Sequence, residues 1–305
     1  MLKYAKRLLG GSAPDPVDAA MDARPPGGTT GPSRDAPPVH LFHIAYSPAT
    51  WANIPPGAQA LKNFTSRSDW REYWPIRTFL LNERLDEEAF YGFFSPRLQE
   101  KTGLTYEAMA RFIQDSPADC DICLFSPFPE LSAFFPNVFD QFEFMFPGAE
   151  AVCQAFFRHA GLEVDLRNLV MDAHQTVFSN YFAARPRFWR AWLDLNEKLF
   201  AVCEGADSPL KRTLNAPTRY AGDVQYKVFI MERTASLLLT LDGRWRTRAF
   251  NTFYLLGEFP EQAVLCQALK SAMRQQHAPE YRQMYDHTRR GVFGDRWEQV
   301  PGRIL

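Results

Sequence analysis

The chain has 305 residues, of which 46% are hydrophobic and 23% charged, and this is the composition of an ordinary globular protein. Its formal net charge at pH 7 is −1 and it contains no long basic run, which argues against nucleic acid as the main partner. No run of about 18 apolar residues occurs, which argues against a transmembrane helix. The five scattered cysteines favour a reducing compartment, and we expect a cytoplasmic protein.

The first 38 residues differ in composition from the rest of the chain. Residues 10 to 38 contain seven Pro and five Gly, so this stretch has too little apolar surface to offset the entropy lost on ordering. We predict a disordered tail or linker over 1–38 and a single α/β domain over 39–305. Residues 1–9 place three cations beside apolar residues. Two interpretations remain open for them: peripheral contact with an anionic inner-membrane surface, or a solvated tail.

The elements predicted for the first half of the domain alternate between strand and helix. In chain order, we predict a strand over 39–46, a helix over 69–81 interrupted at Pro75, a strand over 89–94, a helix over 105–115 and a strand over 121–125. Thr105 is a suitable N-cap for the helix that follows it.

The second half continues this alternation and ends in helices. We predict a helix over 149–159 that ends at Gly161, a strand over 176–184, a helix over 186–204 that ends at Gly205, a helix over 228–239, and helical structure over 261–288. Strands that alternate with helices predict a mostly parallel sheet flanked by helices, here with a helical C-terminal part.

In such sheets, ligands bind beyond the carboxyl ends of the strands. The carboxyl ends of the predicted strands lie at Tyr46 with Ser47, at Ser95, at Ser126 and in the region around Asn180, so we expect ligand contacts there. Proline follows Ser47, Ser95 and Ser126 and restricts the backbone before it. These serines are therefore either rigidly presented hydrogen-bond donors or ordinary loop residues.

The segment from Val228 to Leu239 is apolar on every side of a predicted helix, but it contains Glu232 and Arg233. Charged residues are rarely buried unless they are paired. The two residues therefore form an internal ion pair, or they face a polar cleft in which an arginine suits phosphate.

Two other segments contain candidate site residues. Asp119 and Asp121 have the D-x-D spacing with which many sugar transferases hold Mn²⁺ or Mg²⁺ on a diphosphate, but they precede their strand and also fit a solvated turn. Residues 137–148, which include Glu143, alternate polar side chains with large aromatics. This pattern is typical of a carbohydrate site and also of a loop whose aromatics fill the core.

Several common enzyme fingerprints are missing from the sequence. There is no G-x-S-x-G, no P-loop sequence, and no G-x-G-x-x-G after the first predicted strand. These absences argue against common serine hydrolases, P-loop kinases and standard dehydrogenases.

Taken together, five parts of the chain resemble bacterial glycosyltransferases of cell-surface polysaccharide synthesis. The matching segments are Tyr91–Arg97 with Glu100–Gly103, Ile122–Phe128, Asn137–Gly148, Ser179–Phe182 with Phe188–Trp189, and Phe229–Ser236. They span about residues 40 to 245. The resemblance implies a GT-A-like fold and transfer of a sugar from a nucleotide-sugar donor to a glycan or glycolipid acceptor.

The same resemblance implies a site at one cleft. Its donor-binding residues would be Tyr46, Ser47, Ser95, Lys101, Ser126, Asn180 and Arg233. In our hypothesis, Glu232 or Glu143 accepts the proton of the acceptor hydroxyl, while Arg233 and Lys101 stabilise the leaving diphosphate. Because a well-placed D-x-D is lacking, dependence on Mn²⁺ or Mg²⁺ stays open. Two alternatives are a non-catalytic nucleotide- or sugar-binding module of a polysaccharide assembly, and a transferase that acts on nucleotides without sugars.

Overall fold

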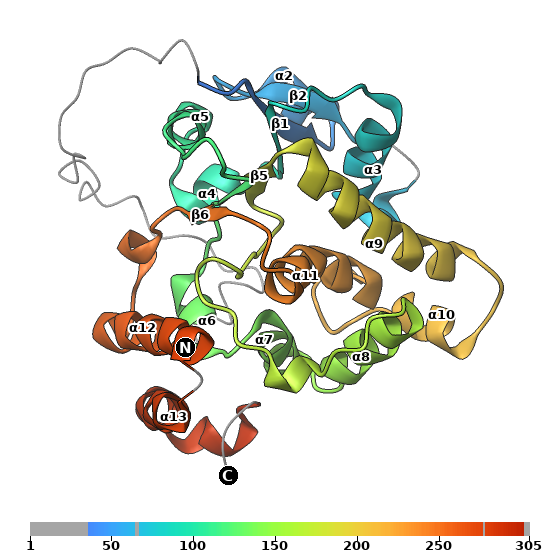
Figure 1. The fold of residues 1–305 in the computed structure, drawn as a ribbon. Coiled ribbons are helices and arrows are strands. Elements are labelled where there is room, and N and C mark those ends of the chain that lie inside the picture. The colour runs from blue at the N-terminus through green and yellow to red at the C-terminus, as the bar shows by residue number, and fades with distance from the viewer. Residues whose placement is uncertain (1–35, 65–66, 277, 302–305) are drawn as a thin grey trace.

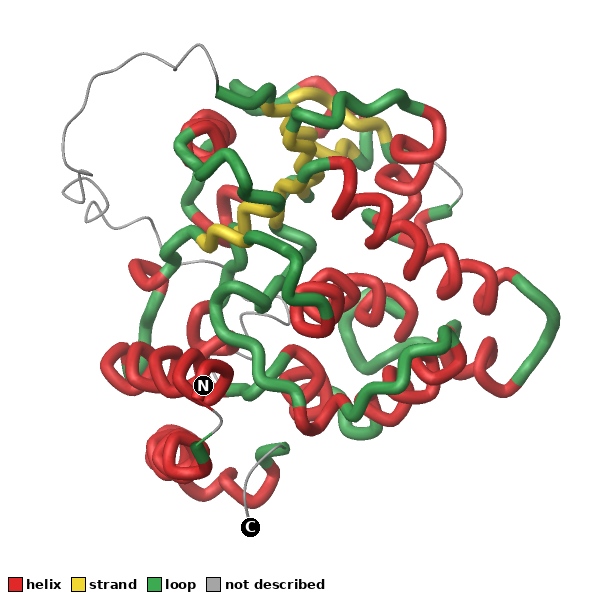
Figure 2. Tube along the Cα trace, in the orientation of Figure 1, coloured by secondary structure: helices red, strands yellow, loops and turns green. Residues whose placement is uncertain are grey.

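The structure, a computed structural model, describes residues 36–64, 67–276 and 278–301. Its centre is one six-stranded sheet with strand order β2-β1-β3-β5-β4-β6. The strands are β1 (Val39–Ala45), β2 (Gln59–Lys62), β3 (Phe90–Phe94), β4 (Ile122–Leu124), β5 (Phe182–Ala184) and β6 (Thr247–Ala249). Figure 2 shows these short strands gathered together, with helices around them.

Five of the strands in this sheet run in one direction. β1 pairs in parallel with β2 and β3, and β4 pairs in parallel with β6. β5 lies between β3 and β4 and is antiparallel to both. The prediction of a mostly parallel α/β sheet is therefore confirmed, with one reversed strand that the sequence pattern did not indicate.

Helices surround the sheet and form the C-terminal part of the described chain. They are α2 (Pro48–Ala52), α3 (Tyr73–Asn82), α4 (Leu98–Thr102), α5 (Tyr106–Gln114), α6 (Pro129–Phe134), α7 (Val138–Met145), α8 (Ala149–His159), α9 (Pro186–Glu204), α10 (Pro209–Leu214), α11 (Tyr226–Leu241), α12 (Pro260–Gln276) and α13 (Pro279–Phe293). Short 3₁₀ turns occupy Ser68–Trp70, Leu166–Asn168, Phe253–Leu255 and Gly294–Gln299. No helix of the described residues is long and apolar enough to cross a membrane.

Both faces of the sheet are covered because side chains alternate along β3. Phe90 and Phe94 belong to the apolar cluster that includes Met109 of α5, whereas Phe93 belongs to the cluster that includes α9. In that second cluster, the rings of Trp189 and Phe182 stack at 4.5 Å. Figure 1 shows α5 and α9 on opposite sides of the strands.

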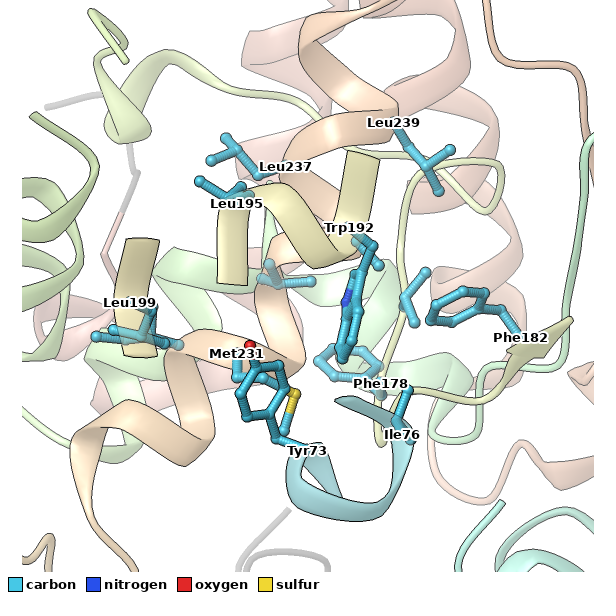
Figure 3. Packing of buried hydrophobic residues seen from close by; sticks show 14 of the residues in the cluster. Tyr73, Ile76, Phe178, Phe182, Trp192, Leu195, Leu199, Met231, Leu237 and Leu239 are labelled. Carbon is cyan, nitrogen blue, oxygen red and sulfur yellow. The ribbon is translucent and has the colours of Figure 1, made fainter. Parts of the chain in front are cut away.

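α11 passes through the interior next to α9. The Asn196 side chain of α9 donates to the Thr234 hydroxyl of α11 at 2.9 Å, within a buried environment. Figure 3 shows Met231 of α11 in the same apolar cluster as Trp192 of α9 and Phe178. This central position carries residues of α11 to the sheet edge described below.

The C-terminal hairpin of α12 and α13 packs against α6. The buried Lys270 amine donates to the carbonyls of Ser132 and Phe135 at 2.6 and 2.7 Å. The buried Arg289 guanidinium donates to the Phe134 carbonyl at 2.8 Å. The last carbonyls of a helix have no partner within the helix, and here the hairpin supplies their donors.

Several sequence expectations need correction. The strand predicted over 176–184 is only Phe182–Ala184, because the preceding residues form turns. Pro75 does not interrupt its helix, since it lies in the first turn of α3, where its missing N–H is tolerated. The predicted segment 261–288 is two helices, with Pro279 at the start of the second. The tail predicted over 1–38 lies outside the described residues except for 36–38.

Candidate functional site

The carboxyl ends of β1, β3 and β4 lie at one edge of the sheet, together with the amino end of the reversed strand β5. A cavity of about 600 Å³ opens there. It is lined by Tyr46, Arg71, Glu72, Ser95, Pro96, Arg97, Lys101, Phe128, Leu131, Gln141, Met145, Phe146, Phe178, Ser179, Tyr220, Ala221, Val224, Val228, Phe229, Glu232 and Arg233. Its volume is in the range of small-molecule sites.

Glu232 is a half-buried carboxyl on the wall of this cavity, in the middle of α11. Neither of its oxygens has a hydrogen-bond or ion-pair partner among residues 36–64, 67–276 and 278–301. Burial, together with the nearby charge of Glu72, raises its pKa to about 7 against the opposing charges of Arg233 and Lys101. Glu232 can therefore both donate and accept a proton near neutral pH.

Arg233 also lines the cavity, but its donors are used within the protein. Its Nε donates to the Val138 carbonyl at 3.0 Å, and its terminal nitrogens donate to the Phe229 carbonyl and to the Gln141 side chain at 2.9 and 2.8 Å. The guanidinium also stacks 4.1 Å from the Phe142 ring centroid. Burial lowers its pKa to about 10. We therefore assign Arg233 to joining α11 and α7 rather than to donor binding.

Lys101 is a half-buried amine at the end of α4. Its Nζ donates to the Ser179 hydroxyl at 2.9 Å and lies 5.4 and 5.8 Å from the ring centroids of Tyr181 and Phe128. Burial lowers the pKa of this amine, against the nearby charge of Glu232. A lysine amine has three donors, and Ser179 uses one of them.

The residue that holds Lys101 belongs to an unusual stretch of backbone. Ser179 and Asn180 have φ values of 60° and 54°, so two consecutive non-glycine residues adopt the left-handed conformation. Such backbone costs on the order of 1 kcal/mol or more per residue, and it is concentrated at functional sites. The strain lies where β5 begins, directly at the cavity.

Two arginines complete the cationic part of the cavity. Arg97 is exposed and forms a bidentate pair with Glu100, at 2.6 and 2.9 Å. Arg71 donates to the Gly222 carbonyl at 3.3 Å and has no carboxylate partner in the described part of the chain. Gly222 belongs to the loop that contributes Tyr220 and Val224 to the cavity.

Tyr46 presents a buried hydroxyl at the same edge. This hydroxyl has no hydrogen bond of acceptable geometry to any described residue. Burial raises the pKa of Tyr46 well above its usual value, and the charge of Glu72 raises it further. Because the hydroxyl oxygen is buried and interacts with Glu72, we do not count Tyr46 among the groups that are open to a ligand.

The other predicted donor residues have mixed placements. Ser95 lines the cavity and shares a hydrogen bond with the Tyr181 hydroxyl at 2.7 Å. Ser47 instead caps α2, and the Ser126 hydroxyl accepts from the Phe178 backbone. Asn180 is buried behind the wall, and its amide nitrogen lies 3.2 Å from the Met231 sulfur. Ser126 and Asn180 therefore support the cavity from outside its lining.

Glu143 and the D-x-D aspartates lie away from the cavity. The two oxygens of Glu143 accept from the backbone amides of Gly148 and Glu150, at the start of α8. Asp121 is fully buried, pairs with Arg187 and accepts from the Arg246 backbone amide at 3.0 Å. Asp119 is exposed in the turn before β4. Glu143 therefore caps a helix, Asp121 forms a structural ion pair, and Asp119 faces solvent.

Candidate metal ligands are not clustered in the described chain. No group of three or more His, Cys, Asp or Glu side chains is placed there to hold a metal ion. The Asp121 oxygens already have two partners and lie at the amino end of β4, opposite the cavity. The aspartates predicted to hold Mn²⁺ or Mg²⁺ therefore do not fit that role.

Sequence reasoning missed several cavity residues. Arg97 directly follows Ser95-Pro96, so it could have been found from its position beyond a strand end. Arg71 and Glu72 follow the short strand β2, which the sequence pattern did not predict. Tyr220 and Ser179 reach the cavity from loops, for which no periodic signal exists.

Comparisons with known proteins identify no relative for this chain. No family model matches it, and neither a curated protein nor a solved structure matches it. The side chains around the cavity are therefore the basis on which a function is inferred.

Proposed function

We propose that this protein is a glycosyltransferase that moves a sugar from a nucleotide-sugar donor to a glycan or glycolipid acceptor of surface polysaccharide synthesis. The observation that carries the proposal is the Glu232 carboxyl, which lines a cavity without a protein partner and has a pKa of about 7. Catalytic acids and bases have pKa values near the working pH, and perturbed carboxyls in clefts are candidates for that role.

The remaining lining residues support an activated sugar as the ligand. Lys101 and Arg71 have no carboxylate partner in the described chain and suit the negative charge of a diphosphate. The Glu232 oxygens can accept hydrogen bonds from sugar hydroxyls. Phe128, Phe146, Phe178 and Phe229 add apolar surface for a sugar ring or a base. A ligand complementary to this wall carries anionic, hydroxyl and apolar groups together.

In the proposed reaction, the acceptor hydroxyl oxygen attacks the anomeric carbon of the donor sugar. Its proton passes to Glu232, and the bond between the anomeric carbon and the diphosphate oxygen breaks. The electron pair of that bond stays on the diphosphate, whose charge lies near the cations of the cavity. A base matched to neutral pH contributes about 10²- to 10⁴-fold to such a step. No step is assigned to Asp119 or Asp121.

The two alternatives differ in what the cavity does with its ligand. A binding module would take up nucleotide sugars and leave them intact, and a transferase acting on nucleotides would not distinguish donors with a sugar from those without one. The carboxyl with a pKa of about 7 at the cavity favours the enzyme, since binding sugar hydroxyls does not require an acid that titrates near neutral pH.

A thermal-shift screen against nucleotide sugars, with and without Mn²⁺, tests the proposal because a bound ligand raises the apparent stability of the folded state. We expect at least one nucleotide sugar to raise the Tm more than its nucleoside diphosphate does. The donor so identified is then incubated with the protein, and released nucleoside diphosphate is measured. Binding without release supports the module, while equal shifts for nucleoside triphosphates support the nucleotide transferase.

A further inference from the structure

We infer that Lys101 and Arg71 together form the diphosphate subsite of the cavity, and that Arg233 is not part of it. The inference rests on the proposed nucleotide-sugar function and names the residues that hold the charged part of the donor. It reverses the expectation from the sequence, in which the arginine of the apolar helix was the principal phosphate ligand.

The four cations of the cavity wall differ in how many hydrogen bonds hold them to the protein. Arg233 donates with all three of its nitrogens to protein acceptors, including two backbone carbonyls. Arg97 engages both oxygens of Glu100. Arg71 has five donors and one hydrogen bond, and Lys101 has three donors and one hydrogen bond. Arg71 and Lys101 are therefore each held to the described protein by a single hydrogen bond, whereas Arg97 is held by two and the buried Arg233 by three.

Charge excludes Arg97 from the subsite, just as the three hydrogen bonds of the buried guanidinium exclude Arg233. Neither Lys101 nor Arg71 has a carboxylate within 4.0 Å in the described chain, whereas Arg97 is neutralised by Glu100. A diphosphate carries at least two negative charges, and two cations without ion-pair partners match it. Arginine adds planar, bidentate recognition of phosphate, while lysine acts as a compact charge.

The surroundings of Lys101 hold its amine ready for an anion. The Ser179 hydroxyl accepts one N–H, and the rings of Tyr181 and Phe128 flank the charge. The left-handed backbone of Ser179 and Asn180 fixes the position of that hydroxyl. A charge that is already positioned loses less entropy when the ligand binds, so this backbone strain has a function in recognition.

Arg71 reaches the cavity from another part of the chain. Arg71 directly follows the Ser68–Trp70 turn and has a φ of 48°. Its side chain donates to the carbonyl of Gly222, which lies in the loop that contributes Tyr220 and Val224 to the cavity. Lys101 follows β3, so the two cations come from segments after different strands of the sheet. Convergence of groups from separate strand ends is expected at the ligand edge of such a sheet.

The test is calorimetric binding of inorganic pyrophosphate and of nucleoside diphosphates to the full chain. We expect Lys101→Met and Arg71→Met each to weaken pyrophosphate binding by about 10- to 100-fold, the value of one charged hydrogen bond. Lys101→Arg and Arg71→Lys keep the charge and should lose less than about tenfold. Arg190→Met removes an exposed cation that is paired with Glu87 outside the cavity, and it should bind like the wild type.

Three further results decide the inference. Glu232→Gln should bind pyrophosphate at least as tightly as the wild type, since it removes a nearby negative charge. Unchanged pyrophosphate affinity in folded Lys101→Met and Arg71→Met, with wild-type circular dichroism, would overturn the subsite. Equal weakening by Arg190→Met would also overturn it, because the effect would then be one of net charge.

Failure of the subsite can be distinguished from failure of the proposed function. If both cations control pyrophosphate binding but no nucleotide sugar is turned over, the subsite stands and the transfer reaction is wrong. If a nucleotide sugar is turned over and its KM is unchanged in both cation variants, the reaction stands and the subsite is wrong.

Discussion

Glu232 and Arg233 are neighbours in the sequence, yet they form no ion pair with each other, and their side chains leave α11 in different directions and have different roles. Arg233 donates to the Val138 and Phe229 carbonyls and to Gln141, whereas Glu232 faces the cavity without a partner in the described chain. Consecutive helix residues point about 100° apart, because a turn contains 3.6 residues. The helix therefore separates a structural cation from a reactive acid.

Arg233→Met should lower stability more than ligand binding. The substitution removes three hydrogen bonds of a buried guanidinium; the Val138 and Phe229 carbonyls keep the backbone donors of their own helices, but the Gln141 oxygen loses its donor. We therefore expect the unfolding free energy to fall by about 3 kcal/mol. Nucleotide-sugar affinity of the folded variant should stay within about threefold of the wild type. Urea unfolding and calorimetric binding measure the two effects. An unchanged unfolding free energy together with a loss of nucleotide-sugar affinity would show that Arg233 binds the donor after all.

Glu232 should make stability depend on pH in a defined window. The folded carboxyl titrates at about 7 and the unfolded one near 4.5, so between these values the folded state binds more protons. The unfolding free energy therefore falls as pH rises from about 4.5 through 7. Glu232→Gln should remove this fall and be more stable than the wild type at pH 8 by up to ~3 kcal/mol. Urea unfolding across this range measures it; parallel curves for the two proteins would contradict the assignment.

Asp121 should matter for stability and not for metal response. Asp121→Asn breaks a buried carboxylate pair with Arg187, and we expect a loss of about 3 kcal/mol of unfolding free energy. Asp119→Asn, at an exposed position in the same turn, should be close to neutral. Thermal unfolding of both variants is measured with and without Mn²⁺. A Mn²⁺-induced Tm increase that both substitutions abolish would restore the metal site.

Lys270 should give the opposite pH dependence. Burial lowers its folded pKa to about 7, while the unfolded amine keeps its proton to about 10.5. Between these values the unfolded state binds more protons, so the unfolding free energy of the wild type rises with pH by about 1 kcal/mol per unit. Lys270→Met should remove this rise.

The control for Lys270 is Lys198→Met, which removes an exposed lysine that also donates to a carbonyl, that of Ala160. This variant should keep the wild-type slope between pH 7 and 9.5. Loss of the slope in both variants would place its origin elsewhere.

The fold was predictable where the sequence carries a local signal. The strand starting at Val39 and the helix from Pro186 to Glu204 follow from a buried apolar run and from Pro and Gly at the helix ends. The direction of β5 was not predictable, because three residues carry no information about their pairing partners. Reversal of β5 nevertheless brings Asn180 to the expected edge, at the start of the strand rather than at its end.

The site was predictable in part, for a similar reason. Tyr46 and Ser95 follow recognisable strands, and Glu232 stands out as an acid in an apolar helix. Glu143 has the same residue type, but its oxygens accept backbone amides of α8, a relationship that depends on tertiary structure. Arg71 reaches the cavity through a short strand and a turn, and neither has a periodic pattern.

The most direct measurement is the rate of nucleoside diphosphate release from the donor that the protein binds, compared between the wild type, Glu232→Gln and Glu143→Gln. We predict that Glu232→Gln releases product at least about 100-fold more slowly, with donor affinity kept, because the base is lost and its volume is not. Glu143→Gln should retain the wild-type rate and lose about 1 kcal/mol of stability as a weakened cap. Equal rates in the wild type and Glu232→Gln, or no release from any bound nucleotide sugar, would contradict the proposed enzyme.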